Sequence, residues 1–349
     1  MFWFLKNRAY SGVPVLRRTA GLPGAVFRIW SSAKWSPIGV DMGDDALTVV
    51  QLENNKRGIS LIAGGSKNRP EDVEPGSSNW QRWAIEAMRE LTANGKFQGR
   101  DVIAAIPASE VFIDHIKMPK IEKDKLQDAV FSKIKQKLPF EADDAMIKYL
   151  PAEDDNVMVV AVERKKIDRH LAIYEKANLQ IKSIAVWPTA LTNSYARFFG
   201  RRKSDVEAIV MLLDIDTNYT NVVICRYKNP LFACSIPVGA KQLGRAPNRG
   251  ERHLGAPADE MIAKLVLELT VCRRRFGSMH EEAQIERLIF LSSHTVDRDI
   301  CTTIAKQLGM PAQMGDCLAA VETANLHGLV IDRRQCKVNW ATAFGLSLS

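Results

Sequence analysis

Two apolar segments of the sequence each end in an aspartate that is followed by a tight turn. Asp41 closes residues 38–41 and is followed by Gly43, and Asp214 closes residues 209–214 about 173 positions later. Glycine at such a turn lets backbone N–H groups approach a phosphate, while a carboxylate at the strand end can manage Mg²⁺ and its water. The pattern therefore predicts a pair of phosphate-binding turns.

The residues around these turns depart from what a bound polyphosphate requires. The first turn continues with Asp44 and Asp45, which add two negative charges, and Asp216 stands where glycine would be natural in the second turn. A third apolar run leads to Ser292 and Ser293, where two glycines would face an adenosine. These departures predict weak or lost nucleotide binding. The alternative for the two strand-end aspartates is that each caps its own turn.

The segments that must position these residues alternate between strand and helix patterns. A strand-acid-turn-strand unit occurs in both halves of the chain, which indicates a duplicated α/β architecture of two lobes with a cleft between them. Apolar runs predict two strands within 38–52 and others at 102–107, 157–162, 209–213, 222–224 and 286–291, and a loop at 64–79. Apolar residues three and four apart predict helices at 80–91, 126–138, 167–174, 261–276, 300–308 and 341–348.

Composition and motif content exclude several classes of protein. With 349 residues, 46% of them hydrophobic and 25% charged, the chain is long enough for two domains or one large two-lobed body. Its six cysteines show no C-x-x-C spacing, which argues against a metal site or a disulfide framework and favours buried, reduced thiols. The sequence contains no P-loop, G-x-S-x-G or G-x-G-x-x-G pattern.

Residues 1–36 form a basic extension that is rich in aromatic side chains and contains no acid. It has no apolar run that would suit a signal sequence or a membrane span. Three interpretations remain open, namely peripheral contact with the headgroups of an acidic membrane, a solvated tail, and a misassigned start codon. The net charge of +8 also permits nucleic-acid contact, but without a binding motif we expect no nucleic-acid partner.

The order of segments between residues 101 and 195 carries a family resemblance. A strand ends at Pro107, Met118-Pro119 follows a second strand, and a helix leads into Leu138-Pro139-Phe140-Glu141. In this order, and in the closing segment 340–346, the chain resembles the PilM family, actin-like proteins of type IV pilus assembly that are related in fold to FtsA.

The resemblance covers residues 37–349 and implies a fold class and a domain division. The fold would be α/β, an actin-like (ribonuclease H-like) duplicated two-lobed fold with a small inserted α/β subdomain. The basic aromatic extension would be 1–36, the first lobe 37–205 with the insertion at about 102–180, and the second lobe 206–349.

The same resemblance implies ATP and Mg²⁺ as ligands and assigns their site. The first phosphate turn would use Asp41 and Gly43. The second turn and the adenosine side would use Asp214, Thr217, Thr220, Ser292 and Ser293. The resemblance implies no catalytic residue for this chain. Because the turns are altered, we expect an adapter protein rather than an enzyme. An active actin-like ATPase is the alternative, and a sugar or acetate kinase is disfavoured because phosphoryl transfer depends on intact phosphate turns.

The family's adapter role implies a protein partner and a location. The partner would be a PilN-like inner-membrane protein, held by its cytoplasmic N-terminal segment in a groove between the first lobe and the insertion, with further contacts to the pilus motor. The protein would therefore work in the cytoplasm at the inner face of the inner membrane. Phe112, Ile116, Phe131 and Phe140 could line that groove, although each could instead be a core side chain. The related adapter of a type II secretion system stays open as an alternative.

Overall fold

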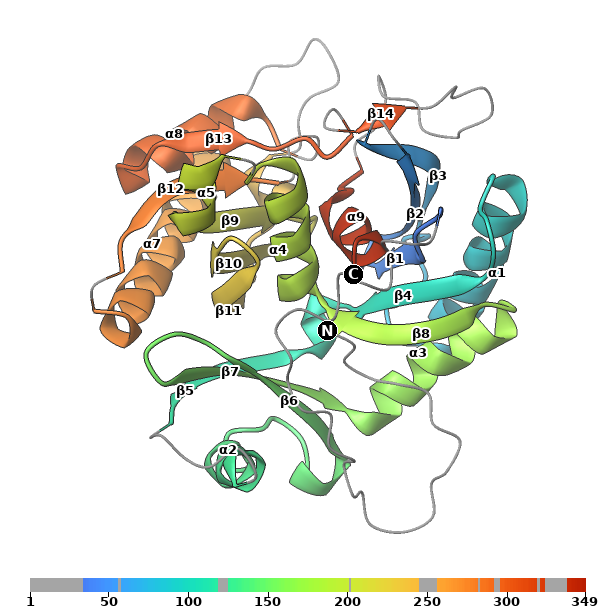
Figure 1. The fold of residues 1–349 in the computed structure, drawn as a ribbon, viewed down its shortest axis with the longest axis horizontal. Helices are drawn as coiled ribbons and strands as arrows, with labels where there is room; N and C mark the ends of the chain where they lie inside the picture. The colour runs from blue at the N-terminus through green and yellow to red at the C-terminus, as the bar shows by residue number, and fades with distance from the viewer. Residues whose placement is uncertain are drawn as a thin grey trace.

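The computed structural model describes residues 34–55, 58–118, 125–200, 202–244, 256–281, 283–291, 296–318, 321–323 and 338–349. Three β-sheets organise these residues, two of them in large lobes and the third in a smaller subdomain (Figure 1). Two helices, α4 (Trp187–Phe198) and α9 (Ala341–Ser347), lie between the lobes. The expected two-lobed α/β fold with an inserted subdomain is confirmed.

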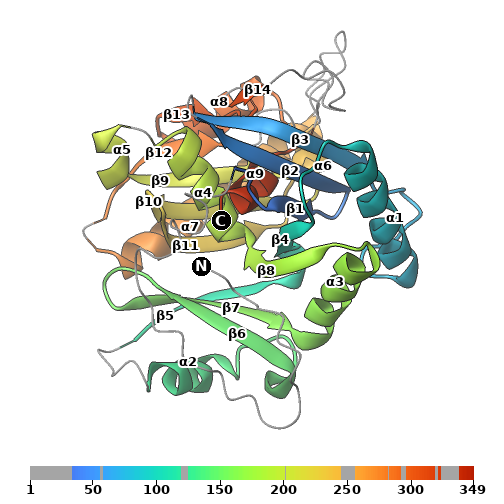
Figure 2. The same cartoon turned by 45° about the vertical axis from the view of Figure 1, so that its right-hand side comes forward.

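The sheet of the first lobe contains the first of the two predicted turns. Its strands run in the order β14 (Glu322–Thr323), β3 (Gly58–Asn68), β2 (Ala46–Asn55), β1 (Ile38–Met42), β4 (Asp101–Ile106) and β8 (Gln180–Val186). β1 pairs antiparallel with β2 and parallel with β4, so the carboxyl end of β1 opens into the turn. Helices α1 (Ser78–Asn94) and α3 (Arg164–Lys176) lie side by side against this sheet (Figure 2).

The sheet of the second lobe repeats this arrangement around the second turn. Its strands run in the order β11 (Asn229–Ile236), β10 (Thr220–Arg226), β9 (Ile209–Ile215), β12 (Ile285–Phe290) and β13 (Ala312–Met314). Every residue of β9 is buried, as expected for a strand that is covered on both faces. Helices α7 (Ala256–Met279) and α8 (Arg298–Leu308) cover one face, and α4 packs on the other. The short helices α5 (Lys203–Glu207) and α6 (Ala240–Leu243) complete this lobe.

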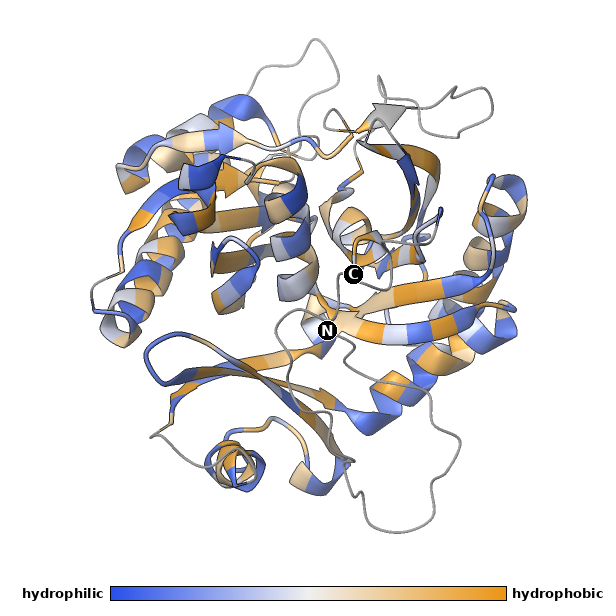
Figure 3. Ribbon diagram, in the orientation of Figure 1, coloured by the Kyte–Doolittle hydropathy of each residue, from blue (hydrophilic) through white to orange (hydrophobic). Residues whose placement is uncertain are grey.

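The subdomain is an antiparallel sheet of three strands with one helix on its outer face. The order is β5 (Phe112–Lys117), β7 (Asn156–Glu163) and β6 (Ala145–Pro151), and α2 (Leu126–Ile134) is the helix. Alternate residues of β7 face opposite ways: Val157 and Val159 pack under α2, whereas Met158, Val160 and Val162 join the core of the main body. Figure 3 shows this apolar character along β7 and along β4 and β8. The short 3₁₀ helices η2 (Ala108–Glu110) and η3 (Ala142–Asp144) flank β5 and β6.

Several boundaries differ from those expected from the sequence. The insertion was expected at about 102–180, but β4 belongs to the sheet of the first lobe, where it pairs with β1 and β8, and the three-stranded sheet spans only Phe112 to Glu163. The loop expected at 64–79 begins later, because β3 continues to Asn68 in register with β2. β14 pairs with β3 and α9 packs on β1, so the end of the chain returns to the first lobe.

Two glycines set how closely α9 approaches its neighbours. A Cβ at Gly39 on β1 would lie 2.6 Å from the backbone nitrogen of Ser347, and a Cβ at Gly345 would lie 2.9 Å from the Cα of Ala190 on α4. Helix α9 is therefore in backbone contact with both β1 and α4. None of the helices that the structure describes combines the length and the apolar content that crossing a membrane requires.

Candidate functional site

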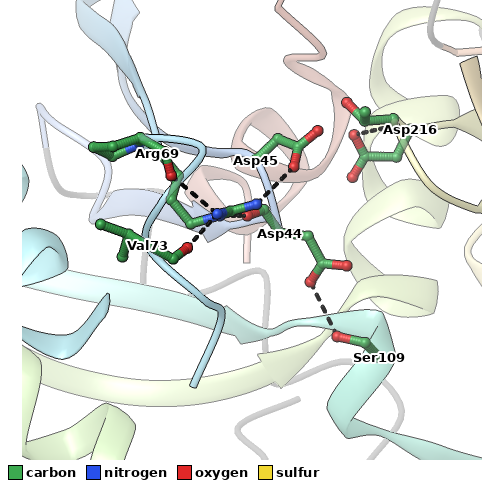
Figure 4. Close-up of polar contacts among 8 residues, drawn as sticks. Asp44, Asp45, Arg69, Val73, Ser109 and Asp216 are labelled. Atoms are coloured by element: carbon green, nitrogen blue, oxygen red, sulfur yellow. Dashed lines mark hydrogen bonds and ion pairs between the residues drawn. The ribbon is translucent and has the colours of Figure 1, made fainter. Parts of the chain in front are cut away.

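The first turn, between β1 and β2, is held by contacts to its two aspartates. The hydroxyl of Ser109 donates to Asp44 Oδ1 at 3.0 Å, and Arg69 Nη2 lies 3.1 Å from Asp45 Oδ1 (Figure 4). Arg69 also donates to the backbone carbonyls of Asp44 and Val73. The guanidinium thus ties the turn to the end of β3, and the positive charge it brings is already paired.

The second turn, between β9 and β10, satisfies its own backbone donors. The backbone N–H of Thr217 donates to Asp216 Oδ1 at 2.8 Å, and the N–H of Asp216 donates to the carbonyl of Tyr219 at 2.9 Å. At the start of α6, the N–H groups of Ala240 and Lys241 donate to the carbonyls of Asp216 and Thr217. A phosphate nest presents such N–H groups to a ligand. Here a side-chain carboxylate of the turn itself takes the place of the anion.

The two turns lie close to one another. A Cβ at Gly43 would lie 3.6 Å from Asp216 Oδ2. Figure 4 shows the Asp216 side chain beside the turn that carries Asp44 and Asp45. The structure therefore brings the predicted residues Asp41, Gly43 and Thr217 close to Asp216, and the Asp216 side chain lies between the two turns.

The electrostatics of this site are those of crowded carboxylates. Burial raises the pKa of Asp41 well above its usual range, and the charges of Asp216, Asp214 and Asp44 raise it further. Burial is also the main reason that the pKa of Asp216 is raised to about 7, with Asp214 adding to the effect. Burial raises the pKa of Asp44 as well, despite its bond from Ser109. Each negative charge makes its neighbours harder to ionise, and a polyphosphate would add more.

Asp214 and Thr220, both predicted to serve the second phosphate turn, have partners within the protein. Asp214 is only 2% exposed, and its two carboxylate oxygens accept hydrogen bonds from the side-chain amides of Asn339 and Asn221. Thr220 is fully buried and donates to the carbonyl of Val238 at 2.7 Å. Burial raises the pKa of Asp214, while the two amides lower it. Asp214 joins the segment before α9 to the second lobe.

Asn339 is a residue of this site that the sequence did not point to. It lies 125 positions from Asp214, and no spacing pattern connects an isolated asparagine with a strand-end aspartate across such a distance. A small hollow beside it is lined by Leu291, Asp316, Cys317 and the residues that lead into α9. Ser292 and Ser293, predicted to face an adenosine, lie outside the described residues. In the part of the chain that the structure describes, no three carboxylate, imidazole or thiol groups are arranged to hold a metal ion.

The four residues predicted to bind a protein partner lie in the subdomain but not on one surface. Ile116 is 6% exposed and, with Phe112, belongs to the cluster beneath α2. Phe131 is 38% exposed on α2, and Phe140 is partly buried just after it. Two of the four thus pack inward, and Phe131 presents an aromatic ring to solvent.

A solved structure shares the fold of this chain over nearly its whole length. The chain is 18% identical to a chain of a PilM–PilN type IV pilus biogenesis complex, with a TM-score of 0.70, and the match covers 90% of this chain and 98% of that one. EutJ, an ethanolamine utilization protein from Carboxydothermus hydrogenoformans, is 12% identical with a TM-score of 0.48 and 90% coverage of both chains. A Bacteroides thetaiotaomicron protein of actin-like ATPase fold and unknown function is 9% identical, with a TM-score of 0.48 and coverage of 85% and 95%.

The sequence itself assigns the family. Residues 39–248, more than half of the chain, match the model of the type IV pilus assembly protein PilM. The chain belongs to the PilM family of type IV pilus assembly proteins. No curated protein sequence matches it.

Proposed function

We propose that this chain is a cytoplasmic scaffold of type IV pilus assembly that binds the cytoplasmic N-terminal segment of a PilN-like inner-membrane protein and does not depend on ATP. The observation that carries the proposal is the hydrogen bond from the Thr217 N–H to the Asp216 carboxylate, which fills the anion position of the second turn. Membership of the PilM family, and the likeness to the PilM chain of a complex with PilN, support the choice of partner.

Binding of ATP would have to undo contacts that the cleft already makes. A phosphate at the second turn would displace Asp216, and it would meet Asp41, Asp44 and Asp45 within the same cleft. Arg69 could offset some of this charge only by leaving Asp45. Metal-bound phosphates need fixed donors and cations to offset their charge, so these residues favour a fold that keeps its shape without nucleotide.

Titration with MgATP tests the nucleotide part of this proposal. We expect no saturable binding below about 1 mM by calorimetry, equivalent to a binding free energy weaker than about −4 kcal/mol. Replacing Asp216 by glycine and Asp44 by serine would free the Thr217 N–H and remove two carboxylates, and should increase affinity for MgATP at least about tenfold. Micromolar binding by the unaltered protein that is lost in Asp41→Ala would contradict the proposal.

The subdomain offers a surface whose chemistry suits a juxtamembrane peptide. Phe131 is an exposed aromatic side chain, and Phe140 is followed by the exposed acids Glu141, Asp143 and Asp144. Segments on the cytoplasmic side of a single membrane span carry an excess of lysine and arginine. An aromatic anchor beside carboxylates is complementary to such a segment, with the charges speeding encounter and the ring supplying buried area.

A synthetic peptide of the partner's cytoplasmic segment tests the interaction. We expect Phe131→Glu and Phe140→Glu each to weaken its binding at least about tenfold, because a desolvated aromatic anchor contributes 1.4 kcal/mol or more. Leu267→Glu on α7 is the matched control, since Leu267 is 63% exposed and lies in the other lobe. Equal affinity for all four proteins, or no binding by the unaltered protein, would contradict the proposal. Circular dichroism of each variant checks that the fold is kept.

A further inference from the structure

Two cysteines of the second lobe lie in direct contact. Cys234 on β11 and Cys272 on α7 have their sulfur atoms 3.1 Å apart, although 38 positions separate them in sequence. Cys234 is partly exposed, whereas Cys272 is buried, as are Cys225, Cys301 and Cys317. Both thiols are reduced in this structure, and the contact brings together the two atoms that a disulfide would join.

The surroundings of the two thiols shift their pKa values in opposite directions. The hydrogen bond from Cys234 lowers the pKa of Cys272, and the guanidinium of Arg275 lowers it further against the opposing effects of burial and Glu268. The same bond, together with burial, raises the pKa of Cys234. Because the thiolate is the nucleophile, this difference favours Cys272 as the sulfur that reacts first, with Cys234 beside it as its partner.

The pair lies next to the contacts by which the second lobe holds the inserted subdomain. The backbone N–H of Ala233, which precedes Cys234, donates to His115 Nε2 at 3.1 Å, and the His115 ring stacks on Phe232 at 4.4 Å. Arg275, one turn beyond Cys272, lies 2.8 Å from Asp114 Oδ1 on the same strand of the subdomain. A covalent link between β11 and α7 would therefore join the two elements that contact β5.

We propose that Cys234 and Cys272 form an oxidation site, at which a peroxide converts the two thiols into a disulfide that fixes β11 to α7 beneath the subdomain. The Cys272 sulfur attacks one oxygen of hydrogen peroxide and the O–O bond breaks. The products are a sulfenic acid on Cys272 and one molecule of water. The Cys234 sulfur then attacks the sulfenic sulfur, the S–S bond forms and a second water leaves. Over both steps the two thiols together lose two electrons, and these electrons reduce one hydrogen peroxide to two molecules of water.

Treatment of the full-length protein with hydrogen peroxide tests the site. Of its six cysteines, two should lose reactivity towards a thiol reagent after denaturation, the intact mass should fall by about 2 Da, and digestion should yield a peptide that joins Cys234 to Cys272. Cys336→Ser is a control variant that removes one of the other four thiols, and the same disulfide should form in it. In Cys234→Ser the sulfenic acid should accumulate on Cys272, where dimedone traps it. A disulfide that maps to other cysteines, six thiols that all stay reactive, or equal labelling of Cys225 and Cys272 would overturn the proposal.

Thermal melting tests the consequence of the link. The oxidised protein should melt about 5 °C higher than the reduced protein, and dithiothreitol should reverse the shift, because the disulfide restricts the unfolded chain. Hydrogen exchange at the amides of β5 should slow in parallel, whereas Cys234→Ser should show neither change. A disulfide between these cysteines that alters neither melting nor exchange would overturn the claim that it fixes the subdomain's attachment.

Discussion

Gly345→Ala is expected to destabilise this protein by at least about 3 kcal/mol, because the added methyl group has no room between two helices. It would lie 2.9 Å from the Cα of Ala190 and closer still to that residue's carbonyl group. These neighbours belong to the backbone of α4 and cannot rotate away as a side chain could. Thermal or chemical denaturation should show a fall in melting temperature of roughly 6 °C or more.

Gly277→Ala is the matched control for this prediction. Gly277 lies within α7, and a Cβ added there would meet no atom within 4 Å. Alanine is favoured over glycine inside an exposed helix, so this variant should be about 0.5–1 kcal/mol more stable than the unaltered protein. If Gly345→Ala melted together with the unaltered protein while Gly277→Ala behaved as expected, α9 would not be in backbone contact with α4.

The contacts of α9 explain how the cleft can keep its shape without a ligand. The helix packs on β1 of the first lobe and on α4, which in turn covers the sheet of the second lobe. Just before it, Asn339 donates to Asp214 at the end of β9, and at its end the hydroxyl of Ser347 lies 2.7 Å from that of Ser36. Side chains of the protein thus make connections across the cleft that a bound nucleotide could otherwise provide.

Local patterns in the sequence were enough to predict the elements that carry the site. β1 and β2 around Gly43, β9 before Asp214, and the buried face of α7 follow from apolar runs and from helical spacing. Asn178 follows α3 with a left-handed backbone, φ of 61°, a conformation that asparagine adopts at helix ends. These features depend on neighbouring residues, which is why a single sequence shows them.

The features that the sequence did not predict depend on pairing between distant segments. β4 and β8 carry the same apolar pattern whether they belong to an insertion or to the sheet of the first lobe, and only their parallel pairing with β1 and with each other decides the matter. The sequence did place Asp216 where glycine would be natural in such a turn. It could not show that the Asp216 carboxylate accepts the Thr217 N–H, nor that Thr220 turns inward to Val238.

Asp216→Asn is expected to make the protein more stable at neutral and alkaline pH but to change little near pH 4. The folded protein raises the pKa of Asp216 to about 7, chiefly by burial. Folding thus favours the protonated form of Asp216. The stability that this form contributes is complete below pH 4, near the pKa of Asp216 in the unfolded chain, and it is lost as the pH rises through about 7. The ionised carboxylate opposes folding above that pH, most strongly beside Asp214.

The size of the effect follows from the distance between the two pKa values. The full difference between the folded and unfolded pKa values corresponds to about 4 kcal/mol in the free energy of unfolding. Because the Asp216 side chain is partly exposed to solvent, we expect Asp216→Asn to be more stable than the unaltered protein by roughly 2 kcal/mol at pH 8. Asparagine retains the oxygen that accepts the Thr217 N–H, so the turn keeps its geometry. Asp101→Asn is the control, since its half-exposed carboxylate pairs with Lys182 at the surface. Urea denaturation from pH 4 to pH 8 should show the free energies of unfolding of Asp216→Asn and the unaltered protein diverging, whereas parallel curves would place the Asp216 carboxylate in solvent.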